Sequence, residues 1–68
     1  MSDHSRLIRD IVGKLEAQGW RVHLARGGHF KAYPPDSTKP MVVFPSTPSD
    51  WRGLKNTTST LRRSGAVL

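Results

Sequence analysis

Two adjacent glycines, Gly27 and Gly28, stand between two segments of the chain in which apolar and polar residues alternate. Before the glycines, Trp20, Val22 and Leu24 alternate with Arg21, His23 and Ala25; after them, Phe30 and Ala32 alternate with His29, Lys31 and Tyr33. A period of two is typical of a strand with one buried face. Glycine readily adopts the positive φ angles that a tight turn between two strands requires. The sequence therefore predicts an antiparallel β-hairpin that turns at the glycines.

The length of the turn decides which side chains share a face of this hairpin. A two-residue turn at Gly27-Gly28 would pair Leu24 with Lys31, and would place an aliphatic group opposite an ammonium. A three-residue loop over residues 26–28 instead pairs Leu24 with Phe30 and keeps the large apolar side chains together. We therefore predict the three-residue loop. The other face then carries Arg21, His23, His29, Lys31 and Tyr33 side by side, and this basic face is the best candidate site from the residue pattern alone.

Helical periodicity occurs on both sides of the hairpin. In the first segment, Leu7, Ile8, Ile11, Val12 and Leu15 recur at helical spacing, with Ser2 or Asp3 as N-cap and Gly19 as the stop. In the last segment, Thr47-Pro48-Ser49-Asp50 has the pattern of a helix start, and Trp51, Leu54, Thr58 and Leu61 form the expected buried stripe. Trp20 and Trp51 are both predicted to be core residues. Arg62-Arg63 lie in the last turn of this helix, before Gly65. Two explanations fit them equally well: favourable interaction with the C-terminal end of the helix, and contact with a phosphate backbone.

A third strand is predicted between the hairpin and the second helix. The segment from Pro34 to Pro40 contains three prolines and is a loop, and Met41-Val42-Val43-Phe44 after it is a short strand. This strand is apolar on both faces, so the pattern leaves open which pair looks inward. The predicted order is helix, three antiparallel strands, helix. We expect a single α+β domain over residues 1–68, with the helices on one face of the sheet, as in a double-stranded-RNA-binding-like fold.

Size and charge restrict the possible partners. A chain of 68 residues buries roughly 60% of the surface that its unfolded form exposes, so the core must be small. Eleven Lys and Arg against five Asp and Glu give a formal charge of +6, which makes a polyanion the first partner to consider. A basic solvated surface and complementarity to an acidic protein are the alternatives.

Several classes of protein are disfavoured by what the sequence lacks. The absence of cysteine excludes disulfides and thiolate metal sites. The three histidines are too few and too poorly spaced to predict a metal site, and no cofactor is expected. No apolar stretch is long enough to span a membrane, and the N-terminal segment lacks the apolar region of a signal peptide. We expect a cytoplasmic protein.

His29 is the residue to which the chemistry points. Histidine titrates closer to neutrality than other side chains, which suits it to donate or accept a proton during phosphodiester cleavage. Arg26 and Lys31 flank it and would stabilise negative charge on the phosphoryl oxygens, while Gly27 and Gly28 offer backbone N–H groups at close approach. By turn chemistry alone, the glycines are an ordinary hairpin turn. A second proton-transfer group would be His23 or Tyr33, and the sequence does not choose between them.

Taken together, these motifs resemble the HicA family of small toxins. The resemblance rests on Leu15-Glu16-Ala17-Gln18-Gly19-Trp20, the turn Arg26-Gly27-Gly28-His29, a strand closing at Pro45, and Leu61-Arg62-Arg63-Ser64-Gly65. It covers nearly the whole chain. It implies a ribonuclease that cleaves messenger RNA without a metal, with the histidine of the turn, here His29, as catalytic residue. It also implies a HicB-like antitoxin protein as partner.

The chain departs from the family pattern at two places. Gly28 stands where the family usually has serine or threonine, and residues 46–50 lack a histidine that many members have there. This combination resembles a subgroup associated with phage and actinobacterial genomes. Two alternatives to the nuclease stay open: a catalytically silent RNA-binding or protein-interaction module of the same fold, and a DNA-binding phage protein.

Overall fold

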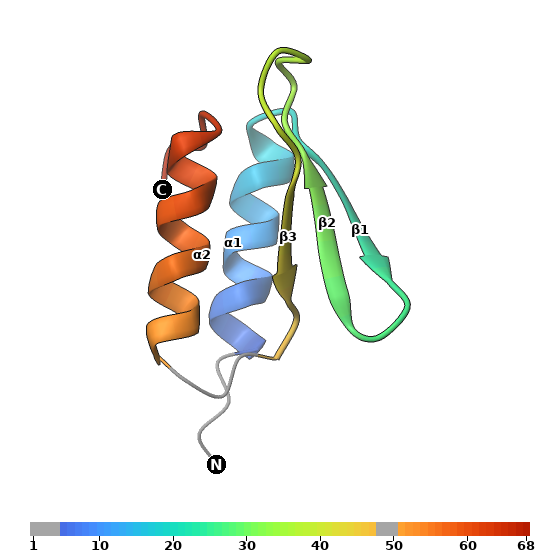
Figure 1. The fold of residues 1–68 in the computed structure, drawn as a ribbon, viewed down its shortest axis with the longest axis vertical. Coiled ribbons are helices and arrows are strands. Elements are labelled where there is room, and N and C mark those ends of the chain that lie inside the picture. The colour runs from blue at the N-terminus through green and yellow to red at the C-terminus, as the bar shows by residue number, and fades with distance from the viewer. Residues whose placement is uncertain (1–4, 48–50) are drawn as a thin grey trace.

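The computed structural model describes residues 5–47 and 51–68 and confirms the predicted order of helix, three antiparallel strands and helix (Figure 1). The elements are α1 (Ser5–Ala17), β1 (Arg21–Ala25), β2 (His29–Tyr33), β3 (Val42–Pro45) and α2 (Trp51–Arg63). The predicted N-caps of α1, residues 2 and 3, lie outside the described residues, as do residues 48–50 after Thr47, the predicted N-cap of the second helix; α2 is described from Trp51. Within the described ranges, no helix is long and apolar enough to cross a membrane.

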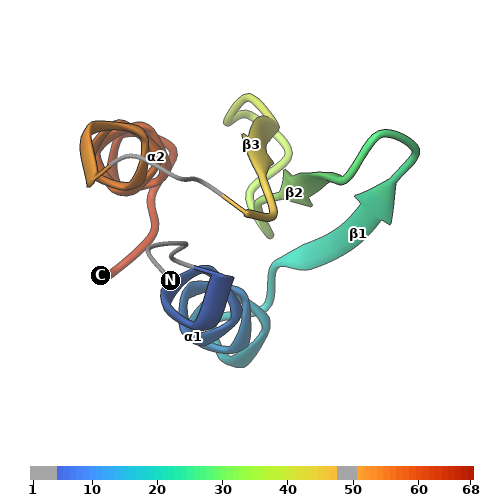
Figure 2. The ribbon, with the colours of Figure 1, turned by 90° about the horizontal axis from the view of Figure 1, so that it is seen from below.

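The three strands form one sheet in the order β1-β2-β3, and both helices lie on the same side of it (Figure 2). β1 pairs with β2 so that Leu24 is opposite Phe30 and Ala25 is opposite His29. This pairing requires the three-residue loop over residues 26–28, so the prediction of the register is confirmed. β2 in turn pairs with β3, with Phe30 opposite Phe44.

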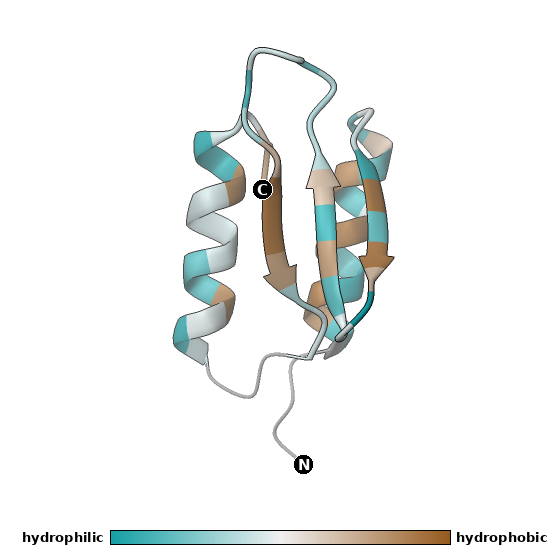
Figure 3. Cartoon of the chain, turned by 45° about the vertical axis from the view of Figure 1, so that its right-hand side comes forward, coloured by the Kyte–Doolittle hydropathy of each residue, from teal (hydrophilic) through white to brown (hydrophobic). Residues whose placement is uncertain are grey.

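The core fills the space between the sheet and the two helices. Its buried apolar residues come from both helices, from β2 and β3, and from the segments that follow both helices: Ile8, Leu15, Trp20, Ala32, Val42, Phe44, Leu54, Leu61 and Ala66. β1 contributes the partly buried Val22, which packs against this core. The register resolves the ambiguity in β3, because Val42 and Phe44 point into this core whereas Val43 is 52% exposed. Figure 3 shows β3 as a hydrophobic strand between a largely hydrophilic α2 and an α1 with apolar bands.

Both helices end in the same way, at a glycine with a positive φ angle. Trp20 N–H donates to the carbonyl of Leu15, and Ala66 N–H donates to that of Leu61, each at 3.0 Å. These bonds run from the second residue beyond the helix to its last turn, the pattern of a Schellman motif with Gly19 or Gly65 at the left-handed position. The side chain of Gln18 then pairs with both backbone groups of Val67 at 2.8 Å, which joins the end of α1 to the segment after α2.

Replacing Gly65 with alanine is expected to lower the free energy of unfolding by about 1–3 kcal/mol. The φ angle of Gly65 is +102°, and a Cβ there would meet no atom within 4 Å, so the loss comes from backbone strain alone. Gly13→Ala is the matched control, because Gly13 lies on the exposed side of α1 and also has open space around it. It is expected to raise the stability by about 0.5–1 kcal/mol. Urea unfolding measures both, and shifts of the same sign would contradict this account.

The prediction that Trp51 is a core residue is wrong, because its side chain is 56% exposed. Each helical residue turns by about 100°, which places Trp51 on one stripe of α2 with Lys55 and Arg62. A different stripe faces the sheet, and its buried members are Leu54, Thr57 and Leu61. Thr58, which was predicted on that stripe, is half-buried.

The placement of Leu24 also differs from the expectation of a buried apolar face. Leu24 lies on the same side of the hairpin as Phe30, yet it is 64% exposed. The loop end of the β1–β2 hairpin projects beyond both helices, so no helix covers this end of the sheet (Figures 1 and 2). The alternation in the sequence therefore predicts correctly which face of the sheet carries Leu24, but it does not predict that the side chain is exposed.

Candidate nucleic-acid interface

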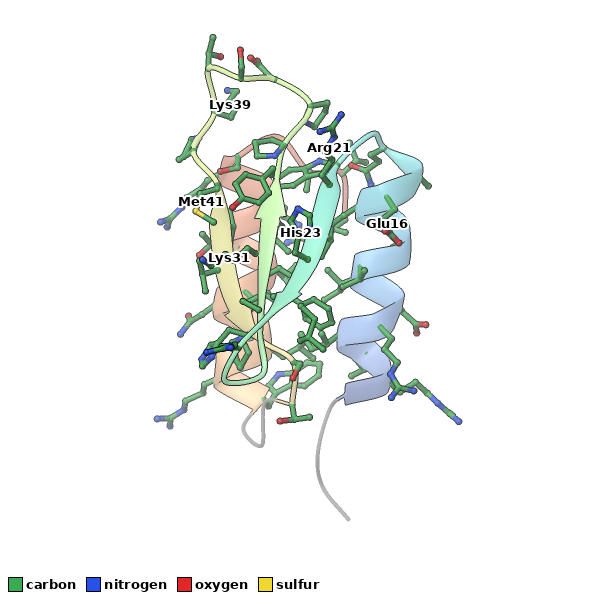
Figure 4. All side chains as sticks on the ribbon, turned by 90° about the vertical axis from the view of Figure 1, so that its right-hand side faces the viewer. Glu16, Arg21, His23, Lys31, Lys39 and Met41 are labelled. Atoms are coloured by element: carbon green, nitrogen blue, oxygen red, sulfur yellow. The ribbon has the colours of Figure 1, made fainter. Side chains whose placement is uncertain are left out.

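One face of the sheet is turned away from both helices and is left uncovered. Its exposed side chains are those predicted for the basic face, together with one from β3: Arg21, His23, His29, Lys31, Tyr33 and Val43. We call this surface the open face. In Figure 4 the labelled Arg21, His23 and Lys31 lie on the side of the sheet turned toward the viewer. The alternation along β1 and β2 brings these residues together, since side chains two apart in a strand share a face.

His29 stands directly over the glycine turn. Gly27 and Gly28 have φ angles of +85° and +77°, which side-chain-bearing residues rarely adopt. A Cβ built at Gly27 would lie 3.8 Å from Nδ1 of His29, so the imidazole lies against the backbone of the turn. Arg26 opens the same loop and is exposed. The site thus combines an imidazole with a close backbone, and Arg26 lies in the same loop.

The sheet register sets the distances between the remaining candidate groups. His23 lies directly opposite Lys31 and diagonally opposite His29. Diagonal neighbours on one face of an antiparallel pair are ~7–8 Å apart. Tyr33 lies on the same strand as His29 but four residues further along, or ~13 Å at the rise of a strand. The rings of His23 and Tyr33 contact each other edge to face, with centroids 5.7 Å apart at 74°.

β3 contributes residues that the sequence analysis did not include in the site. Ser46 N–H donates to the carbonyl of Gly28 at 2.9 Å, and a Cβ built at Gly28 would lie 3.5 Å from Oγ of Ser46. A hydroxyl therefore lies beside Gly28, although it comes from another strand end and not from the turn itself. Val43 joins the open face opposite Lys31, and the exposed Met41 precedes it by two residues. Only the pairing of β2 with β3 reveals these neighbours.

The charges around the open face are of one sign. In the part of the chain that the structure describes, the acidic residues are Asp10 and Glu16 in α1 and Asp36 in the loop between β2 and β3. The hydroxyl and then the backbone amide of Thr38 donate to Oδ1 of Asp36, at 2.6 and 2.9 Å, and hold the pKa of this carboxyl below its usual value. This loop lies at the opposite end of the sheet from the glycine turn (Figure 1). The face around His29 is thus cationic and suits a polyanion.

A hollow of the molecule lies away from this face, along α2. It measures about 280 Å³ and is lined by Trp51, Leu54, Lys55, Thr58, Ser59 and Arg62, all from α2. None of these six residues belongs to the open face. Within residues 5–47 and 51–68, no three His, Asp or Glu side chains are grouped as metal ligands would be.

Comparisons with known proteins identify no relative of this chain. No protein-family model matches the chain, and no curated protein or solved structure is significantly similar to it.

Proposed function

We propose that this protein is a HicA-like endoribonuclease that cleaves messenger RNA without a metal ion, with His29 as its catalytic residue. The observation that carries the proposal is the position of His29. Its imidazole is exposed on the open face, lies against the glycine turn, and has Lys31 two residues along the same strand. Here the ring is presented where a phosphodiester can reach it.

The chemistry uses the RNA itself as the source of the nucleophile. A base removes the proton of the ribose 2′-hydroxyl, and the 2′-oxygen attacks the adjacent phosphorus. The bond from phosphorus to the 5′-oxygen then breaks, and an acid supplies a proton to that leaving oxygen. The products are a 2′,3′-cyclic phosphate and a 5′-hydroxyl, so protons and electrons balance without a cofactor. His29 serves as either the base or the acid.

Of the two candidates for the second proton transfer, His23 has the better position. A base and an acid that act on one linkage must both reach atoms bonded to the same phosphorus. His23 is the diagonal neighbour of His29, at ~7–8 Å, whereas Tyr33 is ~13 Å away along the strand. We therefore assign the second role to His23.

The turn and the flanking cations stabilise the charge that develops in the reaction. Extra negative charge forms on the phosphoryl oxygens in the transition state, and groups fixed in place before the reaction stabilise it most effectively. The N–H groups of Gly27 and Gly28 lie in the turn below the imidazole, and Lys31 and Arg26 add full charges nearby.

A protein inhibitor is part of the proposal. The open face is cationic and flat, with Val43 exposed beside Lys31, so an acidic partner could cover it and exclude RNA. We propose that a HicB-like antitoxin binds there and that both proteins act in the cytoplasm, where messenger RNA is found.

We expect the purified protein to cleave an unstructured RNA in the presence of EDTA and to leave 2′,3′-cyclic phosphate ends. Replacing the ribose at the cleaved position with 2′-deoxyribose is expected to abolish cleavage there, because the nucleophile is lost. Gel analysis of end-labelled RNA measures both results. Cleavage of the deoxy-substituted linkage, or products with a 5′-phosphate, would contradict the mechanism.

Two other outcomes would identify the alternatives. Binding of RNA without cleavage of any sequence supports a silent RNA-binding module. Preferential binding to duplex DNA in competition with RNA supports a DNA-binding protein. Either outcome would overturn the proposed enzyme.

A further inference from the structure

The open face carries apolar groups that the cleavage chemistry does not use. Tyr33 is 39% exposed, Met41 38% and Val43 52%. Val43 lies opposite Lys31, and Tyr33 and Met41 lie farther from the glycine turn. These three side chains are on the face opposite the core, because the residues that alternate with them, Ala32 and Val42, point inward and are buried. Exposed apolar surface among cations needs a ligand that offers both an apolar surface and negative charge.

The aromatic side chain in this group is held in a defined position. The ring of Tyr33 contacts that of His23 edge to face, and Arg21 lies directly opposite Tyr33 on β1. Met41 is labelled in Figure 4 on the same side of the sheet as His23 and Lys31. Lys39 lies beyond Met41 in the neighbouring loop and is also exposed. The aromatic ring thus has a cation, Arg21, opposite it on β1 and a flexible thioether, Met41, on the same side of the sheet, whereas Lys39 lies in the loop near the carboxylate of Asp36.

We infer that Tyr33, with Met41 on the same face of the sheet, binds an unpaired base of single-stranded RNA by stacking, at a subsite separate from the point of cleavage. Every base has a flat π-face, and stacking on exposed aromatic side chains beside cations is how proteins hold single strands. In an RNA duplex the bases are stacked on one another, and mainly phosphates and 2′-hydroxyls are accessible. Arg21, directly opposite Tyr33, is placed to contact a phosphate that flanks the stacked base. The inference rests on the proposed function in one respect, that the ligand is RNA.

The distance along β2 separates this subsite from the scissile linkage. Tyr33 is ~13 Å from His29, which corresponds to about four stacked nucleotides at ~3.4 Å each, and to fewer in an extended strand. The stacked base therefore belongs to a nucleotide some positions away from the cleaved one. Its contribution is to affinity and to the placement of the strand along β2, so its loss should raise KM.

The test measures binding separately from cleavage. The probe is a fluorescent 12-nucleotide RNA without secondary structure, methylated on every 2′-oxygen so that it cannot be cleaved. Tyr33→Ala is expected to weaken its binding about 5- to 100-fold, and Tyr33→Phe to keep it within about 2-fold, because stacking needs the ring and not the hydroxyl. Leu24→Ala is the control, since Leu24 is 64% exposed but lies on the opposite face of the sheet. Circular dichroism shows whether each variant is folded.

A scan with abasic nucleotides locates the stacked base. One abasic position is expected to weaken the binding of the wild type and to have little effect on Tyr33→Ala, because both changes remove the same contact. The same RNA as a 12-base-pair duplex is expected to bind more weakly than the single strand at equal salt.

Each contrary result bears on a different proposal. Unchanged affinity of Tyr33→Ala, an equal loss in Tyr33→Phe, or duplex binding as tight as single-strand binding overturns the stacking subsite, even where cleavage is observed. Tyr33-dependent binding by a protein that cleaves no RNA supports the subsite and overturns the proposed nuclease. No binding to the single strand overturns both.

Discussion

His29→Gln is expected to lower the rate of RNA cleavage by about 10²–10⁴-fold, the usual contribution of a positioned acid or base. Glutamine retains the polar character and approximate size of histidine but cannot take up or release a proton near neutral pH. The affinity for RNA should change by less than about 3-fold, because backbone groups and cations around the turn remain. Single-turnover cleavage and fluorescence anisotropy measure the two quantities.

His4→Gln is the matched control for this variant. It makes the same chemical change at a histidine to which the proposal assigns no role, and it is expected to leave the rate unchanged. The melting temperature of His29→Gln should equal that of the wild type, since His29 is exposed. Induced expression gives a second readout, in which only the wild type and the control arrest growth. A nuclease rate that survives in His29→Gln would remove this residue from the catalytic role.

The hairpin and its register are predictable from sequence because two local rules agree. Alternation has a period of two, so a shift by one residue would have turned every large apolar side chain of the hairpin to the other face. The glycines then limit the turn to two or three residues, and only one of these keeps Leu24 beside Phe30. The open face follows from the same register, so the grouping of His23, His29 and Lys31 is also predictable.

The burial of Leu24 and Trp51 depends on how the helices are positioned against the sheet. The spacing of apolar residues along the sequence carries no information about that position. Leu24 has the period of a core residue, but the hairpin extends beyond α1, and 64% of its surface stays exposed. The predicted stripe of Trp51, Leu54, Thr58 and Leu61 has helical spacing, but the buried stripe of α2 is centred on Leu54, Thr57 and Leu61. Trp51, the first residue of α2, therefore lies beside the stripe that faces the core. Ser46 and Val43 could not be placed in the site before the pairing of β2 with β3 was known.

The second large effect is expected on stability, at Phe44 of β3, the strand for which the sequence left open which residues point inward. Phe44 is 2% exposed, is among the largest fully buried side chains, and contacts Phe30 with ring centroids 5.6 Å apart. Phe44→Ala is expected to cost about 3–5 kcal/mol, the transfer free energy of the ring plus the cavity that it leaves. A single core in a domain below about 70 residues rarely supplies more than ~3–5 kcal/mol in total. The variant should therefore be largely unfolded at 25 °C.

Val43→Ala separates the loss of this core contact from a general weakness of β3. Val43 is the neighbouring residue on the same strand, but its side chain is 52% exposed on the open face. Its replacement is expected to cost less than about 1 kcal/mol, in the range of surface changes in a strand. Far-UV circular dichroism and urea unfolding compare both variants with the wild type. Because β3 pairs with β2, which carries His29, unfolding of Phe44→Ala should also abolish RNA cleavage. Equal losses of stability in the two variants would contradict the inward orientation of Phe44, and with it the open face on which the nuclease proposal depends.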